Sequence, residues 1–213
     1  MYNKIILTEA DIDTLREKIR PYYTEKRYLH TLSVEKEAVK LGEIYLHDEL
    51  MRLRAAALLH DITKIADYEK QLQYCAEFGI IMNIEEGTSP EVLHALTGAS
   101  VAERDFVEFV DDGIVGAIRR HTTGDGAMTV FDALIYLADY IEETRTFEGC
   151  RALRSYFWDR IECGDDKKEV LLDTLIHSFD MTVKHLLDKG SVIDLNTIEA
   201  RNICVARKLF ADE

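Results

Sequence analysis

Residues 55–64 read AAALLHDITK, in which five apolar residues lead directly into His60 and Asp61. Such an apolar run is typical of an element that lies in a protein core. An ionised carboxylate is very costly to bury unless it has a partner of opposite charge. The stretch therefore predicts that Asp61 meets a cation inside the protein, with the imidazole of His60 beside it.

Helical patterns extend outward from this stretch in both directions. Apolar residues recur mostly at three- and four-residue steps, strand signals are almost absent, and the two prolines, Pro21 and Pro90, stand where helices could begin. No repeat or linker divides the chain, so we expect one all-α helical bundle that spans residues 1–213. The expected helices are 8–20, 24–47, 49–65, 67–79, 89–106, 111–121, 129–145, 150–163, 167–189 and 196–210.

The composition limits the classes of partner. The chain has 213 residues, 47% of them hydrophobic, and carries 26 Lys and Arg against 40 Asp and Glu, for a formal net charge of −14. This charge opposes binding to nucleic acid or anionic lipid, so an anionic substrate requires a local basic pocket or a metal. No segment approaches the roughly 20 apolar residues of a membrane span, and we expect a cytoplasmic protein with no membrane partner. The cysteines form no CxxC pair and are expected to be buried free thiols: Cys75, Cys150, Cys163 and Cys204.

The histidines fall into two groups. Three lie among polar or mixed residues and are expected at the surface or in packing contacts: His47, His177 and His185. The other four lie beside apolar residues, in the segments KRYLHTLSV, AALLHDITK, SPEVLHALTG and AIRRHTTGDG: His30, His60, His94 and His121. A single histidine of this kind is usually a satisfied core residue, but four of them together with two acidic residues favour a metal site.

Asp139 is the second acidic residue, and it lies within the apolar segment LIYLADYIEE. It must either point to solvent from the edge of its helix face or have a cation as partner. If residues 49–65 form one helix, His60 and Asp61 diverge by about 100° and could clasp one ion. Imidazole and carboxylate together favour iron, manganese, zinc, cobalt or nickel over calcium or magnesium.

The ordered set His30, His60-Asp61 and Asp139 resembles the signature of the HD-domain metal-dependent phosphohydrolases. The blocks KRYLHTLSV, AALLHDITK, EFGI, LHALTGA, AIRRHTTG and LIYLADYIEETRTFEG are similar to successive motifs of the bacterial YqeK family. An HD dipeptide alone is weak evidence, whereas six blocks in the right order are specific. The loop Glu143–Gly149 departs from the family in having no proline.

The resemblance implies an all-helical HD domain with a motif core at about 24–149 and C-terminal helices, 150–213, packed on it. It implies symmetrical cleavage of diadenosine tetraphosphate and related dinucleoside tetraphosphates to two nucleoside diphosphates. It also implies a divalent transition metal, with iron expected and manganese, cobalt or zinc as alternatives. One ion would take His30, His60, Asp61 and Asp139. A second would share Asp61 and take His94 and His121, which could instead hydrogen-bond phosphate or be packed histidines.

Several residues near these motifs are candidates for contacts with a nucleotide polyphosphate. Asp61 and Lys64 are the expected catalytic residues, because Lys64 would share a helix face with His60 and Asp61. Surface ion pairs are the alternative role for Lys64 and Arg27, and an ordinary helix end is the alternative for Gly124. The expected substrate contacts are Arg27, Lys64, Thr122, Thr123, Gly124 and Arg145.

Two other functions stay open from the sequence. The metal ligands do not measure polyphosphate length, so a phosphohydrolase or phosphodiesterase for mononucleotides or cyclic nucleotides is the first alternative. A non-catalytic nucleotide-sensing module is the second, although the full ligand set argues against it. The sequence also leaves open whether the chain forms a homodimer.

Overall fold

The computed structural model describes residues 4–209, and this part of the chain contains α-helices and short 3₁₀ helices but no strand. The predicted all-α fold is thus confirmed. The α-helices are α1 (Glu9–Ile19), α2 (Glu25–Tyr45), α3 (Leu50–Leu59), α4 (Tyr68–Phe78), α5 (Ile84–Thr88), α6 (Pro90–Asp105), α7 (Asp112–Arg120), α8 (Val130–Ile141), α9 (Glu148–Cys163), α10 (Lys167–Lys189) and α11 (Leu195–Leu209). The 3₁₀ helices are η1 (Arg20–Tyr22), η2 (His47–Glu49) and η3 (Val107–Phe109).

Local sequence signals define most helix ends. Glycines in the left-handed conformation close α4, α9 and α10, where an L side chain would be strained: Gly79, Gly164 and Gly190. At the other end, N-cap side chains accept a hydrogen bond from a backbone N–H of the first turn: Thr8, Thr24, Asp67, Asn83, Asp111, Thr129 and Asp166.

The helix predicted at 49–65 is wrong beyond Leu59. Residues 60–65 form turns, in which the N–H of Lys64 donates to the carbonyl of Asp61 at 2.8 Å. Contacts distant in sequence hold these turns, because Thr63 Oγ1 donates to the His94 carbonyl at 3.0 Å and Gln71 Nε2 donates to the Thr63 carbonyl at 2.8 Å. His60 and Asp61 are therefore neighbours in a turn and do not diverge from a helix axis.

Smaller differences occur elsewhere. The helix predicted at 129–145 ends at Ile141, α9 begins at Glu148 and not at residue 150, and the short helix α5 was not predicted. Phe210, the last residue of the final predicted helix, lies outside the described residues. The four cysteines are free, as predicted, but Cys163 is exposed. His47, His177 and His185 are exposed, and the ring of His177 packs against that of Tyr156.

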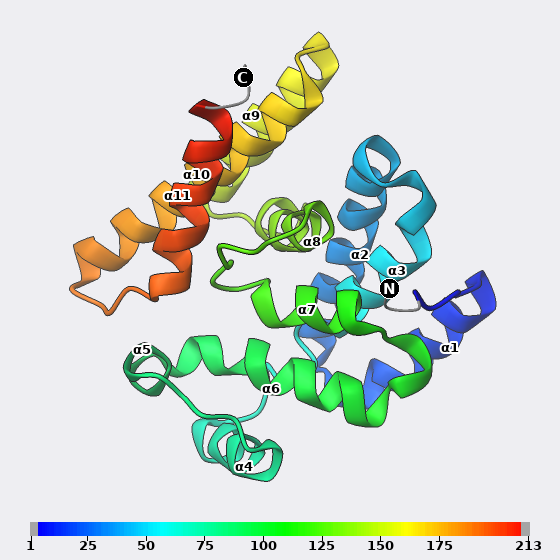
Figure 1. The fold of residues 1–213 in the computed structure, drawn as a ribbon. Coiled ribbons are helices and arrows are strands. Elements are labelled where there is room, and N and C mark those ends of the chain that lie inside the picture. The colour runs from blue at the N-terminus through cyan, green and yellow to red at the C-terminus, as the bar shows by residue number, and fades with distance from the viewer. Residues whose placement is uncertain (1–3, 210–213) are drawn as a thin grey trace.

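Helix α8 lies near the middle of the molecule (Figure 1). It packs against α2, α3 and α7, while α6 packs on α7 and carries α4 on a further face. Most side chains of α8 are buried, including Leu134, Ile135 and Leu137. Helices α2, α3 and α7 therefore meet around α8, and α6 lies next to them through its contact with α7.

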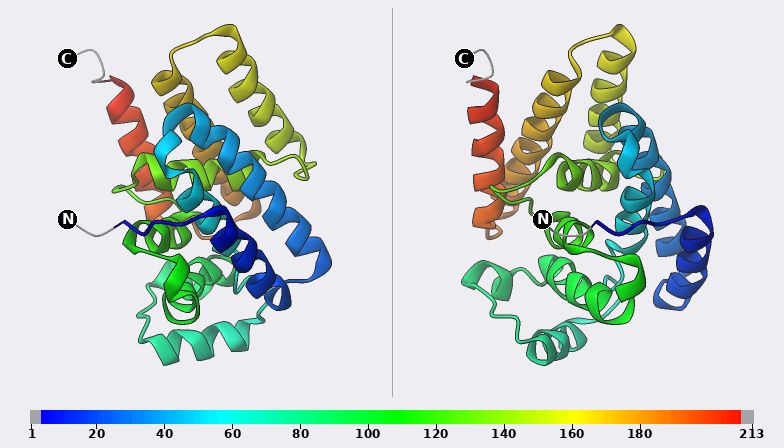
Figure 2. Two further views of the ribbon diagram at one scale, coloured as in Figure 1. Left: turned by 90° about the vertical axis from the view of Figure 1, so that its right-hand side faces the viewer. Right: turned by 45° about the vertical axis from the view of Figure 1, so that its right-hand side comes forward.

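The C-terminal helices α9, α10 and α11 gather on the side of α8 opposite to α4, α5 and α6 (Figures 1 and 2). Helix α10 packs against α9 and α11, and both α9 and α10 contact α8. Phe157 of α9 and Phe179 of α10 are fully buried. Among residues 4–209, no helix has both the length and the apolar character needed to cross a membrane.

A buried ion pair joins α3 to α7. The Asp111 carboxylate accepts hydrogen bonds from Arg52 Nε at 2.7 Å and from Arg52 Nη2 at 2.6 Å. The side chain of Asp111 is 8% exposed and that of Arg52 is 10% exposed. The same carboxylate caps α7 by accepting the N–H of Ile114 and also accepts the N–H of Ile5. Asp111 therefore joins three parts of the chain at once.

We expect Asp111→Ala to lower the free energy of unfolding by about 3 kcal/mol, because it removes a cap and leaves Arg52 buried with less compensation. Burial raises the pKa of Asp111, but hydrogen bonds from Arg52, Ile5 and Ile114 outweigh this and lower it. The stabilisation is therefore present above the ordinary aspartate pKa of about 4 and is lost as the pH falls through the lower folded value. Urea unfolding at several pH values measures it. Asp112→Ala, at the exposed neighbour, is the control and should change stability by about 0.5 kcal/mol or less.

Candidate metal centre

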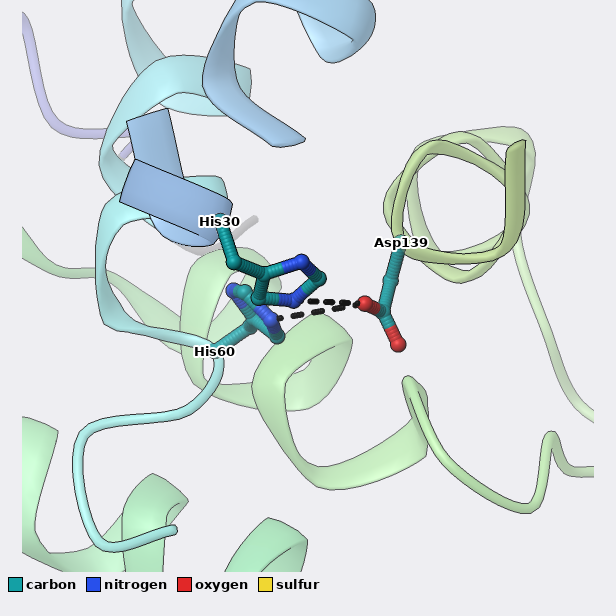
Figure 3. Close-up of side chains that lie close together, drawn as sticks. All are labelled: His30, His60 and Asp139. Carbon is teal, nitrogen blue, oxygen red and sulfur yellow. Dashed lines mark ion pairs between the residues drawn. The ribbon is translucent and has the colours of Figure 1, made fainter. Parts of the chain in front are cut away.

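Six side chains that are far apart in the sequence converge where these helices meet. Their sources are α2 for His30, the turn after α3 for His60 and Asp61, α6 for His94, the end of α7 for His121, and α8 for Asp139. The side chain of Asp139 is 17% exposed and the other five are buried. Figure 3 shows His30 and His60 pointing toward the carboxylate of Asp139.

Asp61 lies at the centre of the cluster and offers one carboxylate oxygen to each side. Its Oδ2 lies 3.3 Å from His60 Nε2 and 3.7 Å from His30 Nε2. Its Oδ1 lies 3.2 Å from His94 Nε2 and 3.6 Å from His121 Nε2. A single carboxylate thus faces two pairs of imidazoles, which is the arrangement of a bridging ligand.

Two overlapping sets of ligand atoms are close enough to hold an ion. His30, His60 and Asp139 form one set, and His60, Asp61 and His121 form the other, with the ligand atoms of each set within 4.8 Å of one another. In the first set, Asp139 Oδ1 lies 3.0 Å from His30 Nε2 and 3.8 Å from His60 Nε2 (Figure 3). His94 adjoins the second set, because its Nε2 lies 3.0 Å from His121 Nε2.

All four imidazoles are held in the same tautomer. Nδ1 lies 2.7 Å from a backbone carbonyl oxygen three residues earlier in His60, His94 and His121. Nδ1 of His30 lies 3.0 Å from Glu142 Oε1. Because these oxygens only accept, each Nδ1 carries a proton, and in the neutral form of each ring the lone pair of Nε2 faces the cluster.

The lone pairs fit a divalent transition metal. Among residues 4–209, Nε2 of His30 and Nε2 of His60 are buried without a hydrogen-bond partner, and the Nε2 atoms of His94 and His121 lie only 3.0 Å apart. Buried polar atoms without partners are rare in native proteins unless a water or an ion satisfies them. Imidazole nitrogens and carboxylate oxygens together are the donors that iron, manganese, cobalt and zinc accept.

The charges of the cluster point to the same conclusion. Burial raises the pKa of Asp61, but the adjacent histidines outweigh burial and hold it well below its ordinary value. Burial lowers the pKa of His30, whereas Asp139, Glu142 and Asp61 together raise it to about 9, so without a metal ion this imidazole also binds a proton at Nε2, where a metal ion would replace it. Burial lowers the pKa of His94 to about 4, which keeps this imidazole neutral and able to act as a ligand.

Three cations surround the cluster. Arg27 Nη1 donates to Asp61 Oδ2 at 2.7 Å, and Arg145 donates to Asp139 Oδ1 at 2.6 Å and to the Asp139 carbonyl at 2.9 Å. Lys64 Nζ lies 3.3 Å from His94 Nε2, the ring nitrogen that can accept a hydrogen bond from it, and burial lowers the pKa of this lysine. The predicted residues Arg27, Lys64 and Arg145 are thus all next to the proposed metal ligands.

Two cavities adjoin the cluster. The larger, of about 880 Å³, is lined by His30 together with Arg27, Lys64 and Arg145. The smaller, of about 260 Å³, is lined by His94 and again by Lys64. A third cavity of about 560 Å³ lies between α8, α10 and α11, is mostly aliphatic and includes none of the six cluster residues. Only the first two combine cations with the cluster, as a polyphosphate requires.

The three residues predicted after His121 lie in different surroundings. Thr122 Oγ1 lies 3.2 Å from His94 Nε2 and 3.1 Å from His121 Nε2. Thr123 and Gly124 line a separate cavity of about 190 Å³. Gly124 has a φ of 72°, and a Cβ there would lie 2.9 Å from Phe179 and from Ala200. The structure therefore brings Thr122 to the cluster but places Gly124 against α10 and α11.

Glu142 is a site residue that the sequence reasoning missed. It follows Asp139 by three residues, directly after α8, and its side chain is fully buried. It holds the His30 imidazole and accepts hydrogen bonds from the N–H and hydroxyl of Thr144. Burial raises the pKa of Glu142, but the hydrogen bonds from His30 and Thr144 outweigh it and help to lower the pKa to about 2. In the sequence, the signal for this residue was a second acidic side chain, three residues after Asp139, at the end of an apolar helix.

Comparisons with known proteins agree with this geometry. Residues 27–144 match the HD domain family. The chain is 35% identical over 188 residues to a Bacillus subtilis protein named bis(5'-nucleosyl)-tetraphosphatase, symmetrical. This match covers 88% of this chain and 94% of that protein. A Staphylococcus aureus protein with the same name is 31% identical over 193 residues, covering 90% of this chain and 93% of the relative.

A solved structure is also similar. It is described as a predicted HD superfamily hydrolase involved in NAD metabolism from Clostridium acetobutylicum. The two chains share 35% identity with a TM-score of 0.80, over 92% of this chain and 97% of the other. The likeness therefore covers the C-terminal helices as well as the cluster.

We expect Glu142→Ala to weaken binding of Mn²⁺ about 10- to 100-fold, because His30 loses the acceptor that fixes its tautomer. Isothermal titration calorimetry of the metal-free protein with Mn²⁺ measures the affinity. Glu143→Ala is the matched control, because Glu143 is exposed and pairs with Lys36 on the surface. Equal affinities for the two variants would contradict the role of Glu142.

Proposed function

This chain belongs to the HD domain family, and from that premise we propose that it hydrolyses diadenosine tetraphosphate and related dinucleoside tetraphosphates symmetrically, to two nucleoside diphosphates. The curated relatives that match most of the chain carry that activity in their names. The observation that carries the proposal is the position of Asp61, whose two oxygens face two separate pairs of imidazoles.

We propose two divalent ions, with iron the expected metal. One would be held by His30, His60, Asp61 and Asp139, and the other by Asp61 with His94 and His121. The unpartnered Nε2 atoms of His30 and His60 support the first position, and the facing Nε2 atoms of His94 and His121 support the second. Such ions, when bound, act as Lewis acids that lower the pKa of water and neutralise phosphate charge.

The chain's own cations have a separate task in this proposal. Hydrolysis adds water to one of the two central phosphorus atoms and breaks its bond to the bridging oxygen, which departs with the other nucleoside diphosphate. Lys64 lines both cavities and would neutralise charge on the central phosphates, which makes it and Asp61 the proposed catalytic residues. Arg27 and Arg145 now pair with Asp61 and Asp139. They would contact phosphate oxygens in the larger cavity, while Thr122 would offer a hydroxyl beside His94 and His121.

The state of the cysteines also supports a location in the cytoplasm. The four cysteines are free in this structure, and free thiols persist where the cell keeps them reduced. We therefore propose that the enzyme works in the cytoplasm.

Iron-loaded protein should convert diadenosine tetraphosphate to ADP alone, without ATP and AMP, as measured by chromatography of the products. Asp61→Ala should lower kcat by about a thousandfold or more, since it removes the ligand shared by both sides of the cluster. Asp159→Ala, at an exposed position of α9, serves as the control. Consumption of a mononucleotide or a cyclic nucleotide while diadenosine tetraphosphate survives would favour the alternative phosphohydrolase function.

Metal content tests the two-ion arrangement independently of activity. Elemental analysis of protein reconstituted with ferrous iron should give two ions per chain. The double variant His94→Ala/His121→Ala should retain one, because the ligands on the Asp61 Oδ2 side remain. His177→Ala, at an exposed histidine of α10, should retain both. A wild-type protein that binds one ion, or a double variant that binds two, contradicts the arrangement.

A further inference from the structure

Large apolar side chains are exposed in the walls of both cavities that adjoin the cluster. Leu29, Ile65 and Phe147 line the larger cavity and are 55%, 52% and 73% exposed. Tyr68 lines the smaller cavity and is 47% exposed. Phosphate binding needs none of these groups. Their exposure beside a polyanion site is explained if the ligand also has an apolar face.

The two cavities meet the cluster from its two sides. His30, which faces Asp61 Oδ2, lines the larger cavity, and His94, which faces Asp61 Oδ1, lines the smaller one. Lys64 lines both. A chain of phosphates that passes Lys64 would therefore have one end in each cavity, with the cluster between the ends.

The substrate class matches this division. In a dinucleoside tetraphosphate, one nucleoside and two phosphates lie on each side of the central phosphoanhydride bond. Each base presents a flat π-face, and stacking on an aromatic side chain is favourable for every base. Each cavity holds one exposed aromatic ring, that of Phe147 in the larger and that of Tyr68 in the smaller.

We infer that Phe147 and Tyr68 are base-stacking platforms, one for each nucleoside, which together place the central phosphoanhydride bond at the metal centre; the inference rests on the proposed function. Stacking tolerates different bases, so the platforms determine where the substrate is cut and how many nucleosides it carries, with little selection among bases.

The backbone around Phe147 is held firmly, as a platform requires. Arg154 donates to the carbonyls of Ile141, Glu142 and Arg145, which ties the loop before Phe147 to α9. Arg145 in turn holds the carbonyl and the carboxylate of Asp139. The loop that leads to Phe147 is therefore linked to Asp139 of the cluster through two arginines.

Tyr68 is held in a different way. It is the first residue of α4, directly after the N-cap Asp67, and its hydroxyl lies 3.5 Å from the carbonyl oxygen of Gly87. This contact joins α4 to α5, the helix directly before the first turn of α6, and residues of that turn line the smaller cavity. Replacing Tyr68 with Phe removes the hydroxyl and keeps the ring.

Steady-state kinetics of the iron-loaded, full-length enzyme tests the platforms. Phe147→Ala and Tyr68→Ala should each raise KM for diadenosine tetraphosphate about tenfold and change kcat less than about threefold, from the size of base stacking. Phe147→Tyr and Tyr68→Phe should remain within about twofold of wild type because they keep the rings. Leu187→Ala controls for loss of an exposed apolar side chain, since Leu187 is 64% exposed on α10.

Inorganic tetraphosphate, which has no bases, separates stacking from phosphate binding. Its inhibition constant should be the same in wild type, Phe147→Ala and Tyr68→Ala. The inference is overturned if KM does not change, or if inhibition by inorganic tetraphosphate weakens in parallel with KM, because the rings would then act on the phosphates or on the fold.

Failure of the proposed function leaves a distinct result. A wild-type enzyme that does not cleave diadenosine tetraphosphate refutes the function, and the platforms are then tested by calorimetry with ADP and with pyrophosphate. Binding of ADP about tenfold weaker in at least one Ala variant, with pyrophosphate binding unchanged, supports base stacking. Equal changes for the two ligands, or no change for either, overturn it.

Discussion

The burial of the Asp61 carboxylate among four imidazoles is the constraint on which the rest of the structure depends. The Nδ1 atoms of these imidazoles are held by acceptors outside the cluster, so the lone pairs of Nε2 and of the carboxylates all point inward. Such a centre is stable only with positive charge inside it or at its edge. In this structure Arg27 and Arg145 supply that charge to Asp61 and Asp139. The proposed metal site and the basic cavity beside it therefore arise from one electrostatic requirement.

The ends of helices are where this centre is built. The last four carbonyls of a helix lack a partner within the helix, and the carbonyls of Ala57 in α3 and Ile118 in α7 lie in those last turns. They accept the Nδ1–H groups of His60 and His121. One hydrogen bond thus satisfies a helix end and fixes the tautomer of a ligand. Had α3 continued to residue 65, the Ala57 carbonyl would also have received the backbone N–H of Asp61, and the side chains of His60 and Asp61 would have diverged around the helix axis.

The sequence predicted the all-α fold because its apolar spacing is local, and it singled out the six cluster residues because charged groups in apolar segments need partners. It could not predict the end of α3 at Leu59, because Thr63 is held by the His94 carbonyl, a contact between distant segments. Glu142 was missed for a similar reason: its partner His30 is 112 residues away. Phe147 and Tyr68 gave no signal at all, because an exposed aromatic residue is significant only once the cavity beside it is known.

The electrostatics also explain how an acidic protein accommodates a polyanion. The formal net charge is −14, but at physiological ionic strength charges beyond about 8 Å are largely screened. Within the larger cavity the nearby charges are those of Lys26, Arg27, Lys64 and Arg145, set against Glu25 and Glu142. A small polyphosphate that enters this cavity experiences mainly these groups and the metal centre. For a nucleic acid, which would extend beyond the cavity, the net negative charge of the chain opposes binding. The cations that line the cavity, and its volume, therefore favour the short polyanion of the proposed function.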